Sequence, residues 1–165
     1  MKIIKVKNYE EMSSVASEIL ISEIRKKKNI VVGFATGRTP LGLYKNLVRA
    51  YRKKEIDFSG VRSFNLDEYY PIARNSRESF FSYMFRNLFE LVNIKKENVN
   101  FLDGEAKNFK RECENYEKVI LKNPIDVQIL GVGVNGHIGF NEPGSKFNSK
   151  TRLVELSDAT VKRNS

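Results

Sequence analysis

The chain's single histidine, His137, lies in a glycine-rich stretch over residues 131–143 (GVGVNGHIGFNEP). The stretch also supplies an amide at Asn135 and a carboxylate at Glu142. Glycines provide little packing for a core imidazole and allow close approach of the backbone to a ligand. A nearby carboxylate would fix the imidazole tautomer and raise its pKa, which suits opening of a sugar ring. We predict an acid–base role for His137, against the alternative of a structural histidine.

The first six residues of this stretch also spell G-x-G-x-x-G, the pattern of a dinucleotide-binding loop. That pattern requires a helix that begins within the glycines, so that its N-terminus meets the pyrophosphate. Here Gly139, Pro143 and Gly144 oppose a helix. Glu155 lies near the distance expected of a ribose-binding acid, but no crossover helix precedes it. We interpret the match as a chance overlap.

Two adjacent carboxylates, Asp67 and Glu68, follow a strand-like stretch (FNLDEYY). Neighbouring side chains on an extended backbone face opposite ways, so at most one of them points into a given cleft. A single carboxylate there could take a proton from carbon, provided that burial raises its pKa. The alternative, a solvated turn carboxylate, is the commoner situation for such a residue.

A third stretch, Thr36-Gly37-Arg38-Thr39, leads into a helical pattern with Thr39 as expected N-cap and Pro40 at the first helical position. Free N–H groups at a helix start suit a phosphate, and these side chains could add donors. The stretch lacks the G-x-x-x-x-G-K-[ST] pattern of nucleotide-triphosphate loops, which favours a sugar phosphate over ATP. An ordinary capped turn explains the residues equally well.

Apolar runs and helical periodicity alternate along the chain and define the elements that must position these stretches. The pattern predicts strands over residues 2–6, 30–35, 61–66, 99–102 and 125–130, and helices over about 8–25, 40–51, 79–92 and 107–121. This order predicts a three-layer α/β fold, a mainly parallel, doubly wound, Rossmann-like sheet with helices on both faces. Ligands bind beyond the carboxyl ends of such strands, so we expect the three stretches to meet there.

Composition narrows the class of protein. A chain of 165 residues with 41% hydrophobic content suits one domain. It contains no apolar run near the roughly 20 residues that cross a membrane, and we expect a cytoplasmic protein without membrane partners. One histidine and one cysteine argue against zinc or a disulfide framework. The net charge of +9 invites nucleic-acid binding, but basic residues fall at expected helix ends and no aromatic-interleaved basic stretch exists, so we expect no nucleic-acid partner.

Together, the stretches ATGRTPLGLYKNL, FNLDEYY, ESFFSYM and ILGVGVNGHIGFNEPGS resemble the glucosamine-6-phosphate deaminases of the glucosamine/galactosamine-6-phosphate isomerase family. The related 6-phosphogluconolactonases share a histidine loop, but the continuation over residues 140–143 (FNEP) favours the deaminases. The resemblance implies conversion of D-glucosamine 6-phosphate and water to D-fructose 6-phosphate and ammonia, in amino-sugar (N-acetylglucosamine) catabolism. It also implies that neither a metal nor an organic cofactor takes part.

The resemblance further implies roles for individual residues. His137 would open the pyranose ring, with Asn135 and Glu142 orienting it and completing the ring-opening set. Asp67 would take the proton from C2 and deliver it to C1. The sugar phosphate would be held, largely through backbone N–H groups, by four residues of the third stretch: Thr36, Gly37, Arg38 and Thr39.

Three residues depart from the family pattern. Asn135 stands where some members carry aspartate, so support for the imidazolium would rest more on Glu142. Arg38 replaces a usually small residue and either adds a phosphate contact or crowds the loop. Val154 stands where hexameric members activated by N-acetylglucosamine 6-phosphate carry lysine, in the segment containing Arg152, which weakens the case for that regulation.

The chain also ends at Ser165, just before a phosphate-binding arginine of the family, and lacks a phosphate-binding lysine and part of the lid. We therefore expect one sugar-phosphate isomerase/deaminase domain over residues 1–165, with a sheet incomplete at its C-terminus. Apolar surface exposed in this way leaves homo-oligomer formation open. Besides a deaminase, an inactive or regulatory sugar-phosphate-binding fragment and a 6-phosphogluconolactonase-like hydrolase stay as alternatives.

Overall fold

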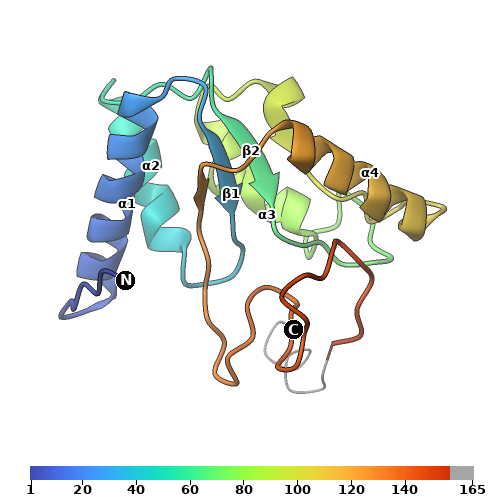
Figure 1. Cartoon of the computed structure of the whole chain (residues 1–165). Coiled ribbons are helices and arrows are strands. Elements are labelled where there is room, and N and C mark those ends of the chain that lie inside the picture. The colour runs from blue at the N-terminus through green and yellow to red at the C-terminus, as the bar shows by residue number, and fades with distance from the viewer. Residues whose placement is uncertain (157–165) are drawn as a thin grey trace.

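The computed structural model describes residues 1–156, which form a four-stranded parallel sheet with helices on both sides (Figure 1). The strands are β1 (Val31–Phe34), β2 (Arg62–Asn65), β3 (Val99–Asn100) and β4 (Val127–Gln128), in the spatial order β3-β2-β1-β4. The α-helices are α1 (Tyr9–Lys26), α2 (Leu41–Arg52), α3 (Phe80–Asn87) and α4 (Phe109–Lys122). Two short 3₁₀ turns, η1 (Phe89–Leu91) and η2 (Lys96–Asn98), lie between α3 and β3.

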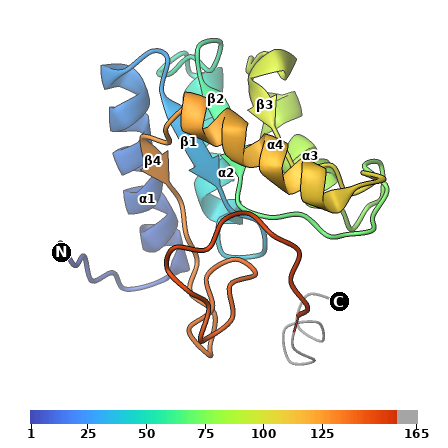
Figure 2. The same cartoon turned by 45° about the vertical axis from the view of Figure 1, so that its right-hand side comes forward.

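The parallel arrangement brings the carboxyl ends of the strands to one edge. Phe34 at the end of β1 pairs with Asn65 at the end of β2, and Val32 of β1 pairs with Val127 of β4. Parallel neighbours require a crossover, and helices α2, α3 and α4 supply it between successive strands. Figures 1 and 2 both place the long segment that follows β4 below this edge of the sheet.

The sheet separates two apolar layers, as its alternating side chains require. Val32 and Phe34 of β1 face the larger layer, which they share with apolar residues of α1, α2 and α3. Val31 of the same strand faces the smaller layer, where Phe64 of β2 packs against Tyr116 of α4. The predicted three-layer α/β architecture is therefore confirmed.

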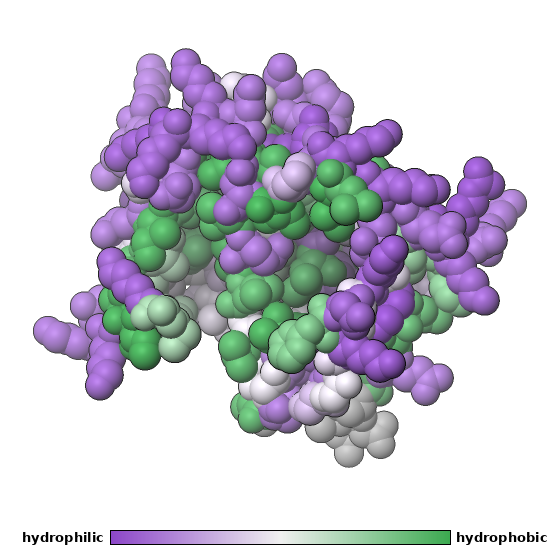
Figure 3. All heavy atoms as spheres, in the orientation of Figure 1, coloured by the Kyte–Doolittle hydropathy of each residue, from purple (hydrophilic) through white to green (hydrophobic). Residues whose placement is uncertain are grey.

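The segment after β4 adds little to these layers. Apolar side chains exposed on it include Leu130, Val132, Val134 and Leu153. In the space-filling view of Figure 3, hydrophilic residues dominate the outer margins and apolar residues reach the surface toward the middle. The hydrophobic core thus lies around the sheet, and the segment that carries His137 is laid across its edge.

Side-chain caps fix the starts of three helices. Asn8, Ser79 and Asn108 each accept a hydrogen bond from the N–H three residues later, at 2.8, 3.0 and 3.0 Å. At α1 the Glu11 carboxylate reaches back to the N–H of Lys7, at 2.6 Å. Asn8 and Glu11 therefore form a capping box whose second bond is shifted by one residue.

The predicted strand over residues 2–6 is wrong. These residues lie outside every strand of the described part of the chain, and Ile3 and Ile4 are largely exposed. A short strand is stable only when a neighbour takes up its backbone hydrogen bonds, and no described strand pairs with this segment. A weak alternation of apolar and polar residues over five positions does not reveal whether a neighbouring strand exists.

The other elements exist with shifted bounds. The predicted helix over residues 79–92 ends at Asn87 and continues as the 3₁₀ turn η1. The predicted strands over residues 99–102 and 125–130 shrink to the two-residue strands β3 and β4. Each of these strands has one described neighbour, so only residues within reach of that neighbour complete the ladder.

Two buried serines make a matched test of local stability. The Ser79 hydroxyl caps α3 and donates to the carbonyl of Arg74 at 2.8 Å, whereas the Ser63 hydroxyl has no partner among the described residues. We expect Ser79→Ala to lower the free energy of unfolding by about 1–2 kcal/mol and Ser63→Ala by less than about 0.5 kcal/mol. Urea unfolding of both variants measures the difference, and equal losses would contradict the assignment of Ser79 as a cap.

Candidate active site

Three strand ends bring the predicted stretches together. Residues 36–39 follow β1 and Asp67 follows β2, two residues beyond the paired Phe34 and Asn65. The third stretch follows β4, the other neighbour of β1. A direct contact then joins the second and third stretches, because the N–H of Phe140 donates to the Asp67 carboxylate. Residues far apart in sequence therefore meet at the predicted edge.

Asp67 has the electrostatic environment of a base. The pKa of its carboxyl is raised to about 7, mainly by burial and also by the adjacent Glu68 carboxylate, while the hydrogen bond from the N–H of Phe140 lowers it in part. The side chain is still partly exposed, so it can be reached by a ligand or by water. A carboxyl that is close to half-ionised at neutral pH can both accept and return a proton.

Glu68 points the other way and has a structural role. Its carboxylate accepts from the N–H groups of Phe80 and Phe81, both at 2.9 Å, in the first turn of α3. A negative charge at a helix start also complements the helix dipole. Glu68 therefore anchors α3 beneath the site, and only Asp67 faces the loop of His137, as the extended backbone predicts.

His137 ends a chain of side-chain hydrogen bonds. The Asn135 amide nitrogen donates to Glu142 Oε2 at 2.8 Å, and the Asn135 Oδ1 lies 2.7 Å from His137 Nδ1. Because the Glu142 carboxylate can only accept, it fixes the Asn135 amide with its nitrogen toward Glu142 and its oxygen toward the imidazole. That amide oxygen can also only accept, so His137 Nδ1 must carry a proton. In the neutral ring the lone pair then lies on Nε2, which is the state required of a base.

Two glycines allow this loop to sit close to its neighbours. A Cβ at Gly133 would lie 2.2 Å from His137 Cε1, so any side chain there would displace the imidazole. Gly139 has a φ of +57°, and its Cβ would lie 2.9 Å from Asp67 Oδ2 and 2.5 Å from Leu66 Cδ2. These glycines allow close approach of the loop to the ring and to the carboxylate.

The loop over residues 36–39 presents its backbone outward. Within residues 1–156, no protein acceptor receives a hydrogen bond from the N–H groups of these four residues. Gly37 adopts a φ of +98° and has open space where its Cβ would be, while Arg38 and Thr39 are exposed. Unused donors beside a helix start are typical of an anion site.

The predicted N-cap of the following helix is wrong by one residue. Helix α2 begins at Leu41, its N-cap is Pro40, and no side chain caps it through the usual bond. The hydroxyl of Tyr9 instead accepts from the N–H of Gly42 at 2.8 Å. This donor is therefore satisfied from α1, and the exposed side chain of Thr39 does not serve as a cap.

An aromatic cluster that sequence reasoning missed connects the loop to α3. The rings of Tyr69, Phe80 and Phe140 lie with their centroids 4.7 to 5.6 Å apart. Tyr69 follows Glu68, Phe80 begins α3, and Phe140 is the residue whose N–H binds Asp67. Tilted ring contacts of this kind add a favourable interaction beyond burial and hold the loop against the carboxylate.

The raised pKa of Asp67 predicts a pH-dependent stability. The folded pKa of about 7 exceeds the unfolded value of about 4, so between these pH values the folded chain binds more protons. The stabilisation of the folded state by protonated Asp67 is complete below about pH 4 and is lost as the pH rises through 7. We expect wild type to lose stability relative to Asp67→Asn between pH 5 and pH 8. Urea unfolding at both pH values measures this, and a constant difference would contradict it.

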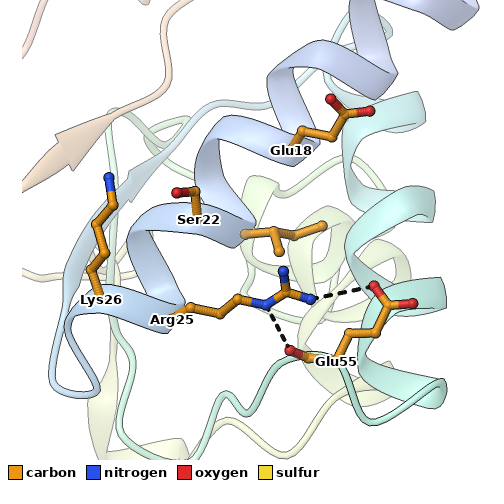
Figure 4. A pocket seen from close by; sticks show the side chains of 6 residues that line it. Glu18, Ser22, Arg25, Lys26 and Glu55 are labelled. Carbon is orange, nitrogen blue, oxygen red and sulfur yellow. Dashed lines mark hydrogen bonds and ion pairs between the residues drawn. The ribbon is translucent and has the colours of Figure 1, made fainter.

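A hollow at the opposite end of the sheet offers no comparable chemistry. It lies between α1 and the turn after α2, where the Arg25 guanidinium donates to the carbonyl of Glu55 and pairs with its carboxylate at 3.6 Å (Figure 4). Lys26 at the same hollow pairs with Glu23 at 2.7 Å. Arg25 and Lys26, two cations that line this hollow, are therefore already paired with carboxylates of the same chain.

Residues 1–156 carry neither a metal-binding cluster of side chains nor a membrane-spanning helix. Within residues 1–156 there is no group of three or more His, Cys, Asp or Glu side chains placed to hold a metal ion. No helix in that part of the chain combines the length and the apolar content needed to cross a membrane.

Known proteins share this chain's sequence and fold. The family described as "Glucosamine-6-phosphate isomerases/6-phosphogluconolactonase" matches residues 7–161. A glucosamine-6-phosphate deaminase of Clostridium acetobutylicum is 48% identical over 166 residues, covering 100% of this chain and 69% of the relative. One from Clostridium botulinum is 50% identical and 68% covered. The chain thus spans about two thirds of the length of these relatives.

Solved structures agree with the sequence matches. A monomeric glucosamine-6-phosphate deaminase superposes with a TM-score of 0.97 at 36% identity, over 99% of this chain and 68% of that protein. A 6-phosphogluconolactonase from Thermotoga maritima shares the fold, with a TM-score of 0.68 at 24% identity over 84% of this chain and 62% of that one. The chain therefore belongs to the glucosamine-6-phosphate isomerase/6-phosphogluconolactonase family and, within it, to the glucosamine-6-phosphate deaminases.

Proposed function

We propose that this chain converts D-glucosamine 6-phosphate and water to D-fructose 6-phosphate and ammonia. One observation carries the proposal: the loop of His137 is hydrogen-bonded to Asp67, whose pKa is raised to about 7, beside a loop with free N–H groups. An acid–base imidazole, a carboxylate poised near neutral pH and an anion site are the groups that an aldose–ketose conversion of a phosphorylated amino sugar requires.

His137 opens the sugar ring in this proposal. With Nδ1–H held by Asn135, Nε2 takes the proton from the C1 hydroxyl and returns it to the ring oxygen, so the C1–O5 bond breaks and an aldehyde forms. Glu142 acts through Asn135 and stabilises the imidazolium that exists between the two transfers. The histidine ends the step in its starting state, and no external acid is consumed.

Asp67 then moves a proton between carbons. Its carboxylate takes the C2 proton, the C2 electrons form a C1–C2 double bond, and a proton from solvent converts the C1 oxygen to the hydroxyl of an enolamine. Return of the proton from Asp67 to C1 leaves an iminium at C2, which water hydrolyses to the ketone of fructose 6-phosphate, releasing ammonia and returning one proton to solvent. A pKa of about 7 keeps acceptance and return comparable in energy at neutral pH.

The phosphate group binds at residues 36–39 in this proposal, largely through backbone N–H groups. The guanidinium of Arg38 is exposed beside them and adds a cation to the anion site. Binding at the far end of the substrate would place C1 and C2 toward Asp67 and His137, since β1 lies between β2 and β4.

The proposal is tested by incubating the purified 165-residue chain with glucosamine 6-phosphate and measuring the ammonia and fructose 6-phosphate that form. We expect both products in equal amounts, and no hydrolysis of 6-phosphogluconolactone in a parallel reaction. Folded protein that binds glucosamine 6-phosphate and releases neither product would support a sugar-phosphate-binding fragment. Hydrolysis of the lactone alone would support the lactonase alternative, and either result would refute the proposed function.

A further inference from the structure

We propose that three tyrosine hydroxyls, those of Tyr9, Tyr44 and Tyr83, position the phosphate-binding loop by holding its carbonyl oxygens. The inference rests on the proposed function, because it assigns positioning residues to the phosphate site of that reaction. All three residues stand outside the loop and contact it through its carbonyl oxygens. Their effect is on the direction in which the loop's N–H groups point.

Each hydroxyl binds a different carbonyl of the loop. Tyr44 donates to the carbonyl of Ala35. Tyr83 donates to the carbonyl of Gly37 at 2.5 Å, and Tyr9 donates to that of Arg38 at 3.1 Å. Three of the carbonyls between residues 35 and 38 are therefore held by side chains that come from three separate helices.

Peptide geometry converts these contacts into orientation of the donors. The peptide bonds after Ala35, Gly37 and Arg38 are trans, since the only cis bond of the described chain is Tyr70–Pro71. In a planar trans peptide the N–H points opposite to the C=O. Holding these carbonyls toward the helices therefore turns the N–H groups of the next residues, Thr36, Arg38 and Thr39, away from the protein.

The three tyrosines are fixed by their own elements. Tyr44 is fully buried within α2, Tyr83 lies in α3, and Tyr9 begins α1 and bridges to the N–H of Gly42. Burial raises the pKa of Tyr44 and of Tyr83, so both hydroxyls stay protonated as donors at any physiological pH. The loop is thus held in place before a ligand arrives.

This arrangement suits a phosphate monoester more than a neutral group. Three N–H groups aimed from one short loop can each donate to an oxygen of one anion, and hydrogen bonds to charged groups are stronger than those between neutral groups. Preorganised donors also avoid the cost of ordering a flexible loop on binding. A loop without its tyrosine hydroxyls would keep the same donors but lose their common direction.

Tyr83→Phe and Tyr9→Phe test the inference, because each keeps the ring and removes one hydroxyl. We expect the dissociation constant for inorganic phosphate, followed through the amide NMR signals of residues 36–39, to rise about tenfold in each variant. The KM for glucosamine 6-phosphate should rise by a similar factor while kcat changes less than about twofold, since the loop binds ground state and transition state alike. Tyr44→Phe is a less decisive variant, since it removes a hydroxyl from the buried core as well as the donor to the partly buried carbonyl of Ala35.

Tyr51→Phe is the matched control. Tyr51 lies on the same helix as Tyr44 and packs against Phe58, and its hydroxyl has no hydrogen bond within residues 1–156. We expect wild-type binding and kinetics for it. Unchanged phosphate affinity in both Tyr83→Phe and Tyr9→Phe would overturn the inference, as would a wild type whose loop signals ignore phosphate. Loop binding that weakens in both variants, without turnover by any protein, would refute only the proposed function.

Discussion

Asp67→Asn is expected to lower kcat for glucosamine 6-phosphate by about 10³-fold, which is within the usual range for loss of a general base. Asparagine has the same shape and its oxygen can still accept from the N–H of Phe140, so the loop contact persists. The amide cannot take the C2 proton. Steady-state release of ammonia measures the effect, and circular dichroism confirms that the variant is folded.

Asp57→Asn is the control for this change. Asp57 lies before β2, at the opposite end of the sheet, where its carboxylate accepts from Ser59 and Asn93. The same chemical substitution there should leave kcat within about twofold of wild type. Wild-type turnover by Asp67→Asn would show that another group is the base.

In the wild type, kcat should rise with pH around 7, because only the ionised Asp67 accepts a proton.

His137→Gln is expected to lower kcat/KM for glucosamine 6-phosphate by about 10²-fold, because glutamine cannot transfer the proton between the C1 hydroxyl and the ring oxygen. The substrate is present mainly as a closed ring, and spontaneous opening would then limit the reaction. Turnover measured under subsaturating substrate shows this effect directly.

Asn135→Leu gives the graded comparison. It leaves the imidazole in place but removes the oxygen that holds Nδ1–H and the amide that binds Glu142. We expect a loss of activity smaller than that of His137→Gln, because the correct tautomer is still populated but no longer enforced. A loss larger than that of His137→Gln would contradict the assignment of Asn135 as a positioning residue.

Most of the fold was predictable from local pattern. The continuous apolar run over residues 30–35 marks a strand covered on both faces, and β1 is indeed the buried centre of the sheet. The caps Asn8 and Ser79 also act within three residues, and both lie at the start of stretches that were predicted to be helical. The strand over residues 2–6 and the lengths of β3 and β4 were predicted wrongly, because strand pairing depends on partners distant in sequence.

The site was predictable only in part, because some of its contacts also join residues that are distant in sequence. Parallel strands and their carboxyl ends explain why the three stretches meet, and an extended backbone explains why Asp67 and Glu68 diverge. Sequence pattern placed Tyr44 only within the helix predicted over residues 40–51. The hydroxyl contacts of Tyr9 and Tyr83 join residues 29 and 46 positions apart, so only the folded chain brings them together. The catalytic and phosphate-binding roles of the site residues stay predictions.

Transfer of the C2 proton can be followed by NMR with glucosamine 6-phosphate in D₂O. Asp67 is partly exposed, so its carboxyl exchanges with solvent and would deliver deuterium to carbon. We expect wild type to form fructose 6-phosphate that carries deuterium at C1, and Asp67→Asn to form essentially none in the same time. Deuterated product from Asp67→Asn at the wild-type rate, or no product from the folded wild type, would contradict the proposed reaction.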